Sequence, residues 1–313
     1  MRGFLTDPET KPQFSGHETF PLRQLWLRKA CDAVRDAGGN AGAVFSNERS
    51  IVDFGVGKNM VTSIRHWALA SGFVEIGADN LLLTPLCHRV LGGDVFNQEG
   101  LDPFLEHPTS AWIVHWNLAS HGLRSTTWYW VFNHIVQPTF DREHLLHSIK
   151  QFIESRPKLQ VSESTLRRDI ECFIRSYVPR LGGESPEEIA EPILGELGLI
   201  HEVSKGTFSF RRGPKHTLSD GLFVFALLDF WERFDANASS LSFGAIAHEY
   251  GSPGRVFKLD ENAVADRLMA LESFTKGRLM WTDAAGTRQV SRLKEAARDM
   301  SAYKMDVLGK AYD

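Results

Sequence analysis

The segment between residues 51 and 84 combines a helical hydrophobic pattern with a hairpin pattern. A helix follows Gly55 and Gly57 and ends before Gly72. Residues 73–84, FVEIGADNLLLT, read as two short strands around a polar turn. Five apolar residues at helical spacing should face the core: Met60, Val61, Ile64, Trp67 and Ala68. With helices predicted upstream from Pro21 to Gly38 and over 45–56, this order predicts a winged helix-turn-helix, whose second helix enters the DNA major groove.

The other face of the same helix carries side chains that can hydrogen-bond phosphates and base edges. These predicted DNA contacts are Lys58, Asn59, Thr62, Arg65 and His66. On an isolated helix such a face is more often simply solvated, but the preceding turn and following hairpin favour DNA binding. The run from Gly55 to Lys58 is not a phosphate loop, because Val52 stands where the first glycine belongs and Asn59 where Ser or Thr should bind magnesium.

Residues 160–212 repeat this organisation. Ser162 can cap a helix whose apolar stripe consists of Leu166, Ile170, Phe173, Ile174 and Tyr177. A hairpin with its turn at Lys205-Gly206 follows a loop around Pro186. The predicted DNA contacts outside the stripe and beyond the hairpin are Ser164, Arg167, Arg168, Arg175, Arg211, Arg212 and Lys215. The alternative is an ordinary polar hairpin.

The middle of the chain is rich in tryptophan and histidine. We expect four tryptophans to fill a helical core between the modules: Trp112, Trp116, Trp128 and Trp130. His107, His115, His121 and His134 could be metal ligands, but no metal-ligand spacing supports this, and core or interface histidines are the favoured interpretation.

The C-terminal part begins with a strongly apolar helix over 218–235 and ends with a hairpin turning at 283–286. The tight loop from Gly251 to Arg255, with Lys258 nearby, could bind an anion, so Arg255 and Lys258 are further predicted DNA contacts. A third winged-helix-like unit is predicted here, with a structural or oligomerisation role because its exposed helix face is acidic.

A chain of 313 residues is expected to form several packed domains. The predicted bounds are 1–98 for the first winged-helix module, 99–158 for the helical middle, 159–217 for the second winged-helix module and 218–313 for the C-terminal part. The predicted fold class is mainly α with short β-hairpins (α+β), with tandem winged helix-turn-helix modules joined by a helical, aromatic-rich middle. The net charge of −4 counts against non-specific coating of nucleic acid. Three scattered cysteines, and no signal-peptide or transmembrane pattern, predict a cytoplasmic protein without membrane contact.

A nuclease site is not evident from known motifs, since no HNH, GIY-YIG or PD-(D/E)xK pattern is present. The most suggestive residues are His17 and Glu18, which place an acid beside a histidine at a glycine turn. They are the candidate catalytic residues. The favoured alternative is a capped turn that ties the N-terminus to the first module.

Three stretches resemble one family: FSGHETFPLRQLWL at 14–27, GVGKNMVTSIRHW at 55–67 and SPGRVFKLDENAV at 252–264. TTWYWVFN, SESTLRRDIECFIRSYVPR and FRRGPK lie between them in the order typical of that family. The chain is similar to the bacterial domain-of-unknown-function family 4007, whose members are encoded beside DNA phosphorothioation genes. The member in the single-strand phosphorothioation (Ssp) antiphage system is thought to bind and nick DNA.

The resemblance implies a DNA-binding protein of a phosphorothioation and antiphage defence system, which could nick DNA and then need Mg²⁺. Implied partners are double-stranded DNA, a sulfurtransferase, a cysteine desulfurase and an ATPase, and a homodimer is compatible with this class of fold. Two alternatives stay open: a non-enzymatic adaptor that bridges the sulfurtransferase and the ATPase, and a winged-helix transcriptional regulator.

Overall fold

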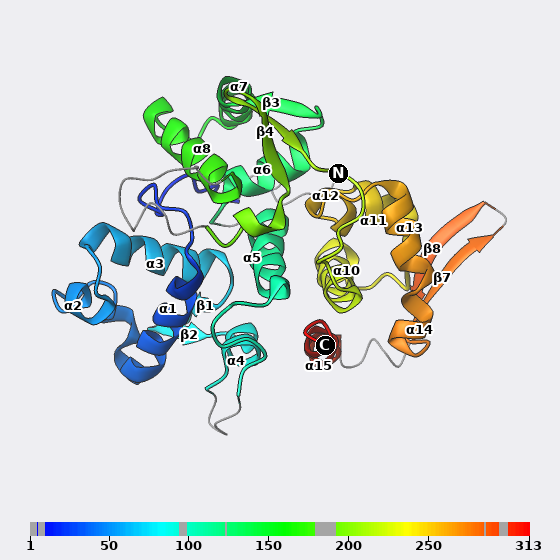
Figure 1. Cartoon of the computed structure of the whole chain (residues 1–313), viewed down its shortest axis with the longest axis horizontal. Coiled ribbons are helices and arrows are strands. Elements are labelled where there is room, and N and C mark those ends of the chain that lie inside the picture. Colours follow the sequence, from blue (N-terminus) through cyan, green and yellow to red (C-terminus); the bar gives the residue numbers. More distant parts are fainter. Residues whose placement is uncertain are drawn as a thin grey trace.

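The computed structural model describes residue 5 and the ranges 10–93, 99–122, 124–178, 192–284, 286–293 and 300–313. Helices dominate these ranges, and the strands form three small antiparallel sheets (Figure 1). The α+β class predicted from the sequence is therefore confirmed. None of the helices within these ranges is long and apolar enough to cross a membrane.

The first unit packs α1 against α3 and carries a two-stranded hairpin, in which Val74 pairs with Leu83. Its elements are α1 (Gln24–Ala37), η2 (Gly38–Ala43), α2 (Ser50–Phe54), α3 (Lys58–Ala70), β1 (Val74–Ile76), β2 (Leu81–Leu83) and α4 (Pro85–Leu91). Gly55 ends α2 with a φ of 64°, a left-handed conformation that favours glycine. The predicted order of helices and strands is present, although α2 is shorter than expected.

Two details of α1 differ from the prediction. The helix begins at Gln24 rather than at Pro21, after an extended Arg23. From the sequence, Leu22, Leu25, Trp26, Cys31 and Val34 are expected to form one apolar face of this helix. Leu25 is instead 50% exposed, whereas its neighbours Trp26 and Leu27 are buried. Leu25 therefore lies beside the buried stripe rather than in it, because it is one position before the buried Trp26 in the helical period.

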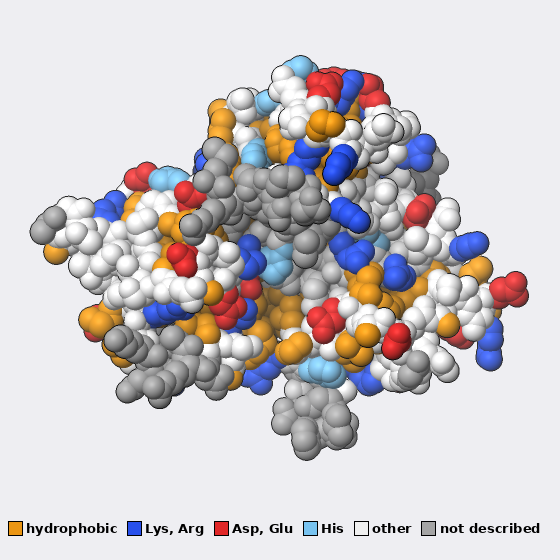
Figure 2. All heavy atoms as spheres, turned by 180° about the vertical axis from the view of Figure 1, so that it is seen from behind, with side chains coloured by type: hydrophobic (Ala, Val, Ile, Leu, Met, Phe, Trp, Pro, Cys, Tyr) orange, Lys and Arg blue, Asp and Glu red, His pale blue; other side chains and the backbone are white. Residues whose placement is uncertain are grey.

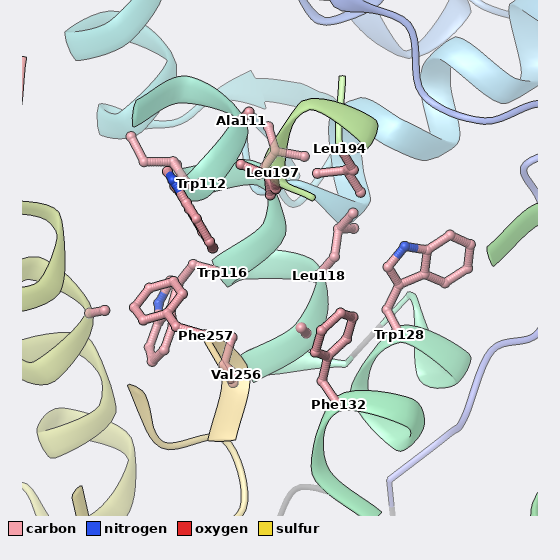
Figure 3. Packing of buried hydrophobic residues seen from close by; sticks show 14 of the residues in the cluster. Ala111, Trp112, Trp116, Leu118, Trp128, Phe132, Leu194, Leu197, Val256 and Phe257 are labelled. Carbon is pink, nitrogen blue, oxygen red and sulfur yellow. The ribbon is translucent and has the colours of Figure 1, made fainter. Parts of the chain in front are cut away.

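The central helix α5 (Pro108–His121) is buried along its length, from Thr109 to Ser120. A helix that is apolar on every side is expected inside a core rather than at a surface. It packs against α6 (Thr126–His134) and against elements of the C-terminal half. Figure 3 shows Trp112, Trp116 and Leu118 on α5 between Leu194 and Leu197 on one side and Val256 and Phe257 on the other.

Three of the four tryptophans predicted to fill this core do so. Trp112, Trp116 and Trp128 are fully buried, whereas Trp130 is only partly buried. The difference arises because Trp130 lies on the side of α6 that faces α7 and the surface, where its indole N–H donates to Ser148 at 2.9 Å.

The middle histidines have structural partners. Buried His115 contacts the Tyr177 hydroxyl at 2.7 Å through Nδ1 and the Val256 carbonyl at 2.9 Å through Nε2. Burial lowers the pKa of His115 to about 3. His107 caps the start of α5, and His121 contacts the Asp229 carboxylate at 2.8 Å.

The second and third units share one arrangement: a helix, a strand, further helices and a hairpin. The second comprises α6, β3 (Thr139–Asp141), α7 (Arg142–Glu154), α8 (Glu163–Tyr177), η3 (Gly195–Leu197), β4 (Ile200–Ser204) and β5 (Thr207–Phe210). The third comprises α10 (Asp220–Asp235), β6 (Ser240–Ser242), α11 (Phe243–His248), α12 (Pro253–Val256), α13 (Glu261–Met269), α14 (Leu271–Thr275), β7 (Leu279–Ala284) and β8 (Thr287–Arg292). Their sheets have the orders β3-β5-β4 and β6-β8-β7, so in both the first strand pairs with the third.

The helix α15 (Met300–Gly309) packs on α10, and the hairpin β7-β8 projects from the edge of the molecule (Figure 1).

The five residues predicted to form the stripe of α8, from Leu166 to Tyr177, are all buried. The predicted loop around Pro186 lies outside the described residues, as does position 285 in the C-terminal turn. The domain boundary predicted between residues 158 and 159 would separate β3 from β5. Because these two strands pair with each other, we propose that the second unit begins with α6.

Candidate nucleic-acid interface

The outer face of α3 presents Lys58, Asn59 and Thr62 to solvent, with Arg65 half-buried one turn further on. The helix starts after Gly57, which offers no side-chain cap, and its first turn contains no acidic residue. Its first backbone N–H groups therefore point outward without a carboxylate to neutralise the positive end of the helix dipole. Such a helix start attracts anions, phosphates included.

Arg124 joins this face from the turn between α5 and α6. Burial lowers the pKa of the Arg124 guanidinium, and the neighbouring positive charge of Arg65 lowers it further. In the described ranges neither arginine forms an ion pair with a carboxylate. Two close guanidinium groups without a counter-ion repel each other, and an anion such as a phosphate would relieve that repulsion.

Sequence patterns do not point to Arg124, because it lies in a turn with no periodic pattern. Figure 2 shows Lys and Arg side chains gathering on the rear face, from the unit at the top towards the first unit at the right. We define the α3 face as Lys58, Asn59, Thr62, Arg65 and Arg124, and in the described ranges none of its three cations pairs with a carboxylate.

His66 does not belong to the α3 face, so its predicted exposure was wrong. Its ring is 5% exposed and lies edge-on to Trp67, with ring centroids 5.0 Å apart. Burial lowers the pKa of His66 to about 3, and the nearby His17, Arg124 and Arg65 add to the effect. His66 lies two residues after Ile64 and three before Leu69, so it falls on the border of the apolar stripe. The segment around Gly16 covers its ring.

His17 lies in a buried polar network that joins three parts of the chain. Its Nε2 lies 2.7 Å from Oδ1 of Asp169 on α8, and Thr127 on α6 donates to the other oxygen of that carboxylate. The backbone N–H of Thr19 donates to His17 Nδ1 at 3.0 Å. Because Nδ1 accepts, the ring proton resides on Nε2 and is donated to Asp169.

This arrangement does not favour the predicted catalytic role of His17. Both ring nitrogens are engaged, and the side chain is 4% exposed, so neither nitrogen can take a proton from water at a DNA backbone. Glu18 is exposed, with a φ of 48°, and no described hydrogen bond or ion pair joins it to His17. The alternative interpretation, a turn that fastens the N-terminal segment, fits better. The His17 ring packs against His66 and Trp67 of the first module and also hydrogen-bonds Asp169 on α8.

The cations of α8 are partly neutralised. Arg167 donates to Glu143 on α7 at 2.6 Å and to Glu163 at 2.9 Å. These two carboxylates raise the pKa of Arg167, and the arginine in turn lowers the pKa of Glu143 and of Glu163. Arg168 and Ser164 are exposed and Arg175 is half-buried, so they remain accessible on this helix.

The basic residues after the second hairpin divide into exposed and buried side chains. Arg211 and Arg212 are exposed, as predicted for contacts beyond a hairpin. Lys215 is 8% exposed, and its ammonium group donates to the carbonyl oxygens of Arg211 and Gly213, both at 2.8 Å. Burial lowers the pKa of Lys215 to about 8. This burial does not favour the predicted DNA contact, because the side chain closes a turn inside the protein.

Lys258 is also buried, which does not favour its predicted role in binding an anion. Its ammonium group donates to the Phe132 carbonyl at 2.7 Å and lies 4.0 Å from the centre of the Phe210 ring. Burial lowers the pKa of Lys258 well below its usual value. Arg255 remains half-exposed, but it donates to the carbonyl oxygens of His248 and Asn133 and so braces its own loop.

No cluster of three or more His, Cys, Asp or Glu side chains suited to a metal ion occurs among the described residues. The three cysteines are buried and free.

Comparison with known proteins identifies the family of this chain. A search of curated proteins gave no match. A crystal structure described as magnesium ion-bound SspB is similar to this chain, with a TM-score of 0.83, 27% identity and coverage of 97% of this chain and 90% of that one. A second SspB crystal structure gives a TM-score of 0.80, 25% identity and coverage of 97% and 93%. The family model described as a protein of unknown function, DUF4007, matches residues 14–312, so the chain belongs to this family, as its sequence motifs indicated.

Proposed function

We propose that this protein binds DNA as part of a bacterial DNA phosphorothioation and antiphage defence system. The observation that carries the proposal is the α3 face, where Lys58, Arg65 and Arg124 lie at the surface without described carboxylate partners. A duplex carries one phosphate charge per roughly 1.7 Å of helix axis, so an unpaired cationic surface on a helix is suited to it. Family membership and the likeness to SspB supply the biological setting.

The strand orders of the second and third units support the same proposal. A winged helix places a strand, two helices and a hairpin in sequence, and the orders β3-β5-β4 and β6-β8-β7 are compatible with that plan. In the second unit α8 would be the recognition helix and β4-β5 the wing, which carries Arg211 and Arg212 at its base. We infer that the chain grips duplex DNA with the α3 face and that α8 has a supporting role.

Nicking remains a separate proposal. With His17 engaged on both sides, DNA cutting by this chain would need other groups or a partner protein. The magnesium ion in the similar SspB structure makes Mg²⁺ the metal to test first. We do not assign residues to such a metal site.

A non-enzymatic adaptor is the second candidate, and one observation favours it. Ile51 and Val52 on α2 and Ile76 and Leu82 on the first hairpin are large apolar side chains with exposures of 44%, 79%, 57% and 48%. Exposed apolar side chains of this size suit contacts with a protein partner, such as the sulfurtransferase, cysteine desulfurase or ATPase of the system. Both functions could reside on one chain.

One experiment separates these proposals. Purified protein is mixed with supercoiled plasmid and with a labelled duplex at increasing ionic strength, with and without Mg²⁺. We expect a mobility shift whose apparent affinity falls steeply with salt, with a slope near −0.9 for each phosphate contacted. Absence of a shift at low salt would contradict DNA binding and leave the adaptor. A shift without open-circle product would contradict only the nicking proposal.

A further inference from the structure

The His121–Asp229 pair joins a largely buried carboxylate to an imidazole ring that solvent reaches. His121 is the last residue of α5 and Asp229 lies on α10, and the His121 Nε2 atom is 2.8 Å from Asp229 Oδ2. The two side chains are 33% and 12% exposed, respectively. In the pair of His17 and Asp169 the exposures are only 4% and 3%. A ligand can therefore reach the ring of His121 but not that of His17.

Donors from three helices hold the Asp229 carboxylate in place. Its Oδ2 accepts from Trp116 at 2.9 Å, from His121 at 2.8 Å and from Arg233 at 3.1 Å. Lys304 on α15 donates to Oδ1 at 3.2 Å. Burial alone would raise the pKa of Asp229, but His121, Arg233 and Lys304 hold that pKa well below its usual value. The carboxylate is therefore ionised and fixed as an acceptor.

The contact with Asp229 determines which nitrogen of His121 carries the proton. Because an ionised carboxylate can only accept, the proton lies on Nε2, and Nδ1 of the neutral ring keeps its lone pair. In the described ranges no hydrogen bond occupies His121 Nδ1. Both nitrogens of His17, by contrast, are engaged. A carboxylate that orients one imidazole nitrogen and leaves the other open is the arrangement of a general base.

A structural role for the His121 ring does not account for this arrangement. Trp116, Arg233 and Lys304 already supply donors to both oxygens of Asp229, so the carboxylate would stay satisfied without the ring. The ring itself is partly exposed, so water can replace its hydrogen bond. The fold therefore depends little on His121.

An arginine lies beside the ring and is accessible to a phosphate. Arg233 and His121 bind the same oxygen of Asp229, so the guanidinium and the ring are neighbours. In the described ranges three N–H groups of Arg233 donate to Asp229 and to the Ser120 carbonyl, which leaves two of the five for a ligand. The Arg233 side chain is 35% exposed.

The pair also lies close to the α3 face along the chain. Arg124 follows His121 by three residues, so their Cα atoms are at most about 11 Å apart. One DNA strand carries a phosphate for roughly each 3.4 Å of helix axis. A strand that Arg124 contacts therefore covers the distance to His121 within about three nucleotides.

We propose that His121 is the general base for hydrolysis of a DNA phosphodiester, with Asp229 as the positioning residue and Arg233 as a phosphate contact. The proposal rests on the proposed DNA-binding function and assigns residues of this chain to the separate proposal of nicking. The observation that carries it is a free, solvent-accessible imidazole nitrogen oriented by a fixed carboxylate beside two arginines.

The step balances without any further reactant. A water molecule at Nδ1 of His121 gives its proton to that nitrogen while its oxygen forms a bond to phosphorus. The bond from phosphorus to one deoxyribose oxygen breaks, and the leaving oxygen takes a proton from solvent. The products are a phosphate monoester and a free hydroxyl, and His121 then returns its proton to solvent.

The test incubates the full chain with supercoiled plasmid, with and without Mg²⁺, and follows the open-circle product, while a labelled duplex measures binding in parallel. The variants are His121→Ala, with and without added imidazole, and Asp229→Asn, whose amide keeps the shape of the acid. His248→Ala is the matched control, because it removes the ring of an exposed pair in which His248 lies 2.9 Å from Glu261. Far-UV circular dichroism and the thermal unfolding midpoint establish that each variant is folded.

We expect His121→Ala to lower the cleavage rate at least about 100-fold, the lower end of what a general base contributes. Duplex affinity should stay within about twofold, because a neutral ring neutralises no phosphate. Imidazole should restore part of the rate of His121→Ala and none of that of Asp229→Asn, in which the ring is present but wrongly oriented. The control should match the unmodified protein.

Several results would overturn the proposal. Duplex binding by the unmodified protein without any open-circle product would remove the cleavage site and keep the proposed DNA-binding function. Cleavage that His121→Ala leaves unchanged, or that His248→Ala reduces equally, would place the chemistry elsewhere. A loss that imidazole does not restore would make His121 a structural residue instead of a base. Absence of both binding and cleavage would contradict the proposed function as well.

Discussion

Helices α3 and α8 share a pattern in the sequence but differ in their electrostatic surroundings. Both carry an apolar stripe and a polar, cationic outer face. On α3, Arg65 lies near a second arginine, Arg124, and has no described carboxylate partner. On α8, Arg167 contacts Glu143 and Glu163 at 2.6 and 2.9 Å. The same residue type is thus available to a ligand on one helix and neutralised on the other.

The inner faces differ as well. The inner face of α3 rests on apolar contacts, with Ile64 and Trp67 fully buried. That of α8 also carries Asp169, whose carboxylate accepts from His17 and Thr127 and so connects α8 to the N-terminal segment and to α6. We conclude that α3 presents cations without described acidic partners. Helix α8 also connects parts of the protein, and one of its outer cations, Arg167, is neutralised by Glu143 and Glu163.

The largest expected effect is on stability, from Asp169→Ala on the inner face of α8. It leaves the donors of His17 and Thr127 buried without an acceptor, and each unsatisfied buried donor costs about 1–3 kcal/mol. Urea unfolding should show the loss. Asp169→Asn keeps one acceptor and should cost less, and Arg168→Ala, at the adjacent exposed position, should cost almost nothing. An unchanged midpoint for Asp169→Ala would show that the network does not support the fold.

The next effect is on DNA binding, from Arg65→Glu/Arg124→Glu on the α3 face. If these two arginines contact phosphates as proposed, reversal of both charges should lower duplex affinity about 100-fold and flatten its salt dependence by a slope of about 2. A gel-shift titration at a fixed, near-physiological salt concentration measures the change. The single substitution Arg167→Glu on α8 should have a much smaller effect, and the control Lys276→Glu/Lys310→Glu should have none. Equal losses for α3 and α8 would end the distinction between the two helices.

Acid should destabilise the protein through its buried histidines, one of which lies on α3. The pKa of His66 and of His115 is about 3 in the folded chain, against an ordinary value of 6.5. The unfolded chain therefore binds more protons between these values, so stability is complete above pH 6.5 and decreases as the pH falls towards 3. Each histidine contributes about 1.4 kcal/mol per pH unit within that window.

Urea unfolding at pH 7, 6 and 5 tests this slope. Burial also lowers the pKa of His134, to about 4, so three histidines share the slope between pH 6 and 5. The variant His66→Asn should therefore lose about a third of that pH dependence, even if its stability at pH 7 is lower. The exposed His216→Asn variant should keep the slope of the unmodified protein. A free energy of unfolding that does not change from pH 7 to pH 5 would contradict burial of these rings.

The smallest effect comes from Glu143→Gln/Glu163→Gln, which removes the charges that neutralise Arg167 without changing the shape of the helix. If α8 approaches the DNA, duplex affinity should rise about threefold to fivefold, because Arg167 and Lys150 then lack ionised partners. The same titration measures it. The exposed pair Glu272→Gln/Asp313→Asn gives an equal change in net charge and should have a smaller effect. A rise equal to that of this control would mean that α8 stays away from the DNA.

Much of the local structure was determined by the sequence itself. The spacing of apolar residues specified the stripes of α3 and α8, and glycines such as Gly55 specified where helices end, because these signals depend on neighbours within one or two turns. Ser162 was correctly identified as the cap of α8, since it accepts from the Thr165 N–H. The family resemblance, carried by several ordered motifs, is confirmed over residues 14–312.

Only the tertiary structure decided which polar residues face solvent. Lys215 and Lys258 look like surface cations in the sequence, yet backbone carbonyls from distant segments and turns satisfy their ammonium groups inside the protein. His17 looks like a catalytic group beside Glu18, yet its partner lies 152 residues away on α8. Burial and ion pairing depend on which segments meet in space, and no local pattern records those meetings. For the same reason the proximity of Arg65 and Arg124 became visible only in the folded chain.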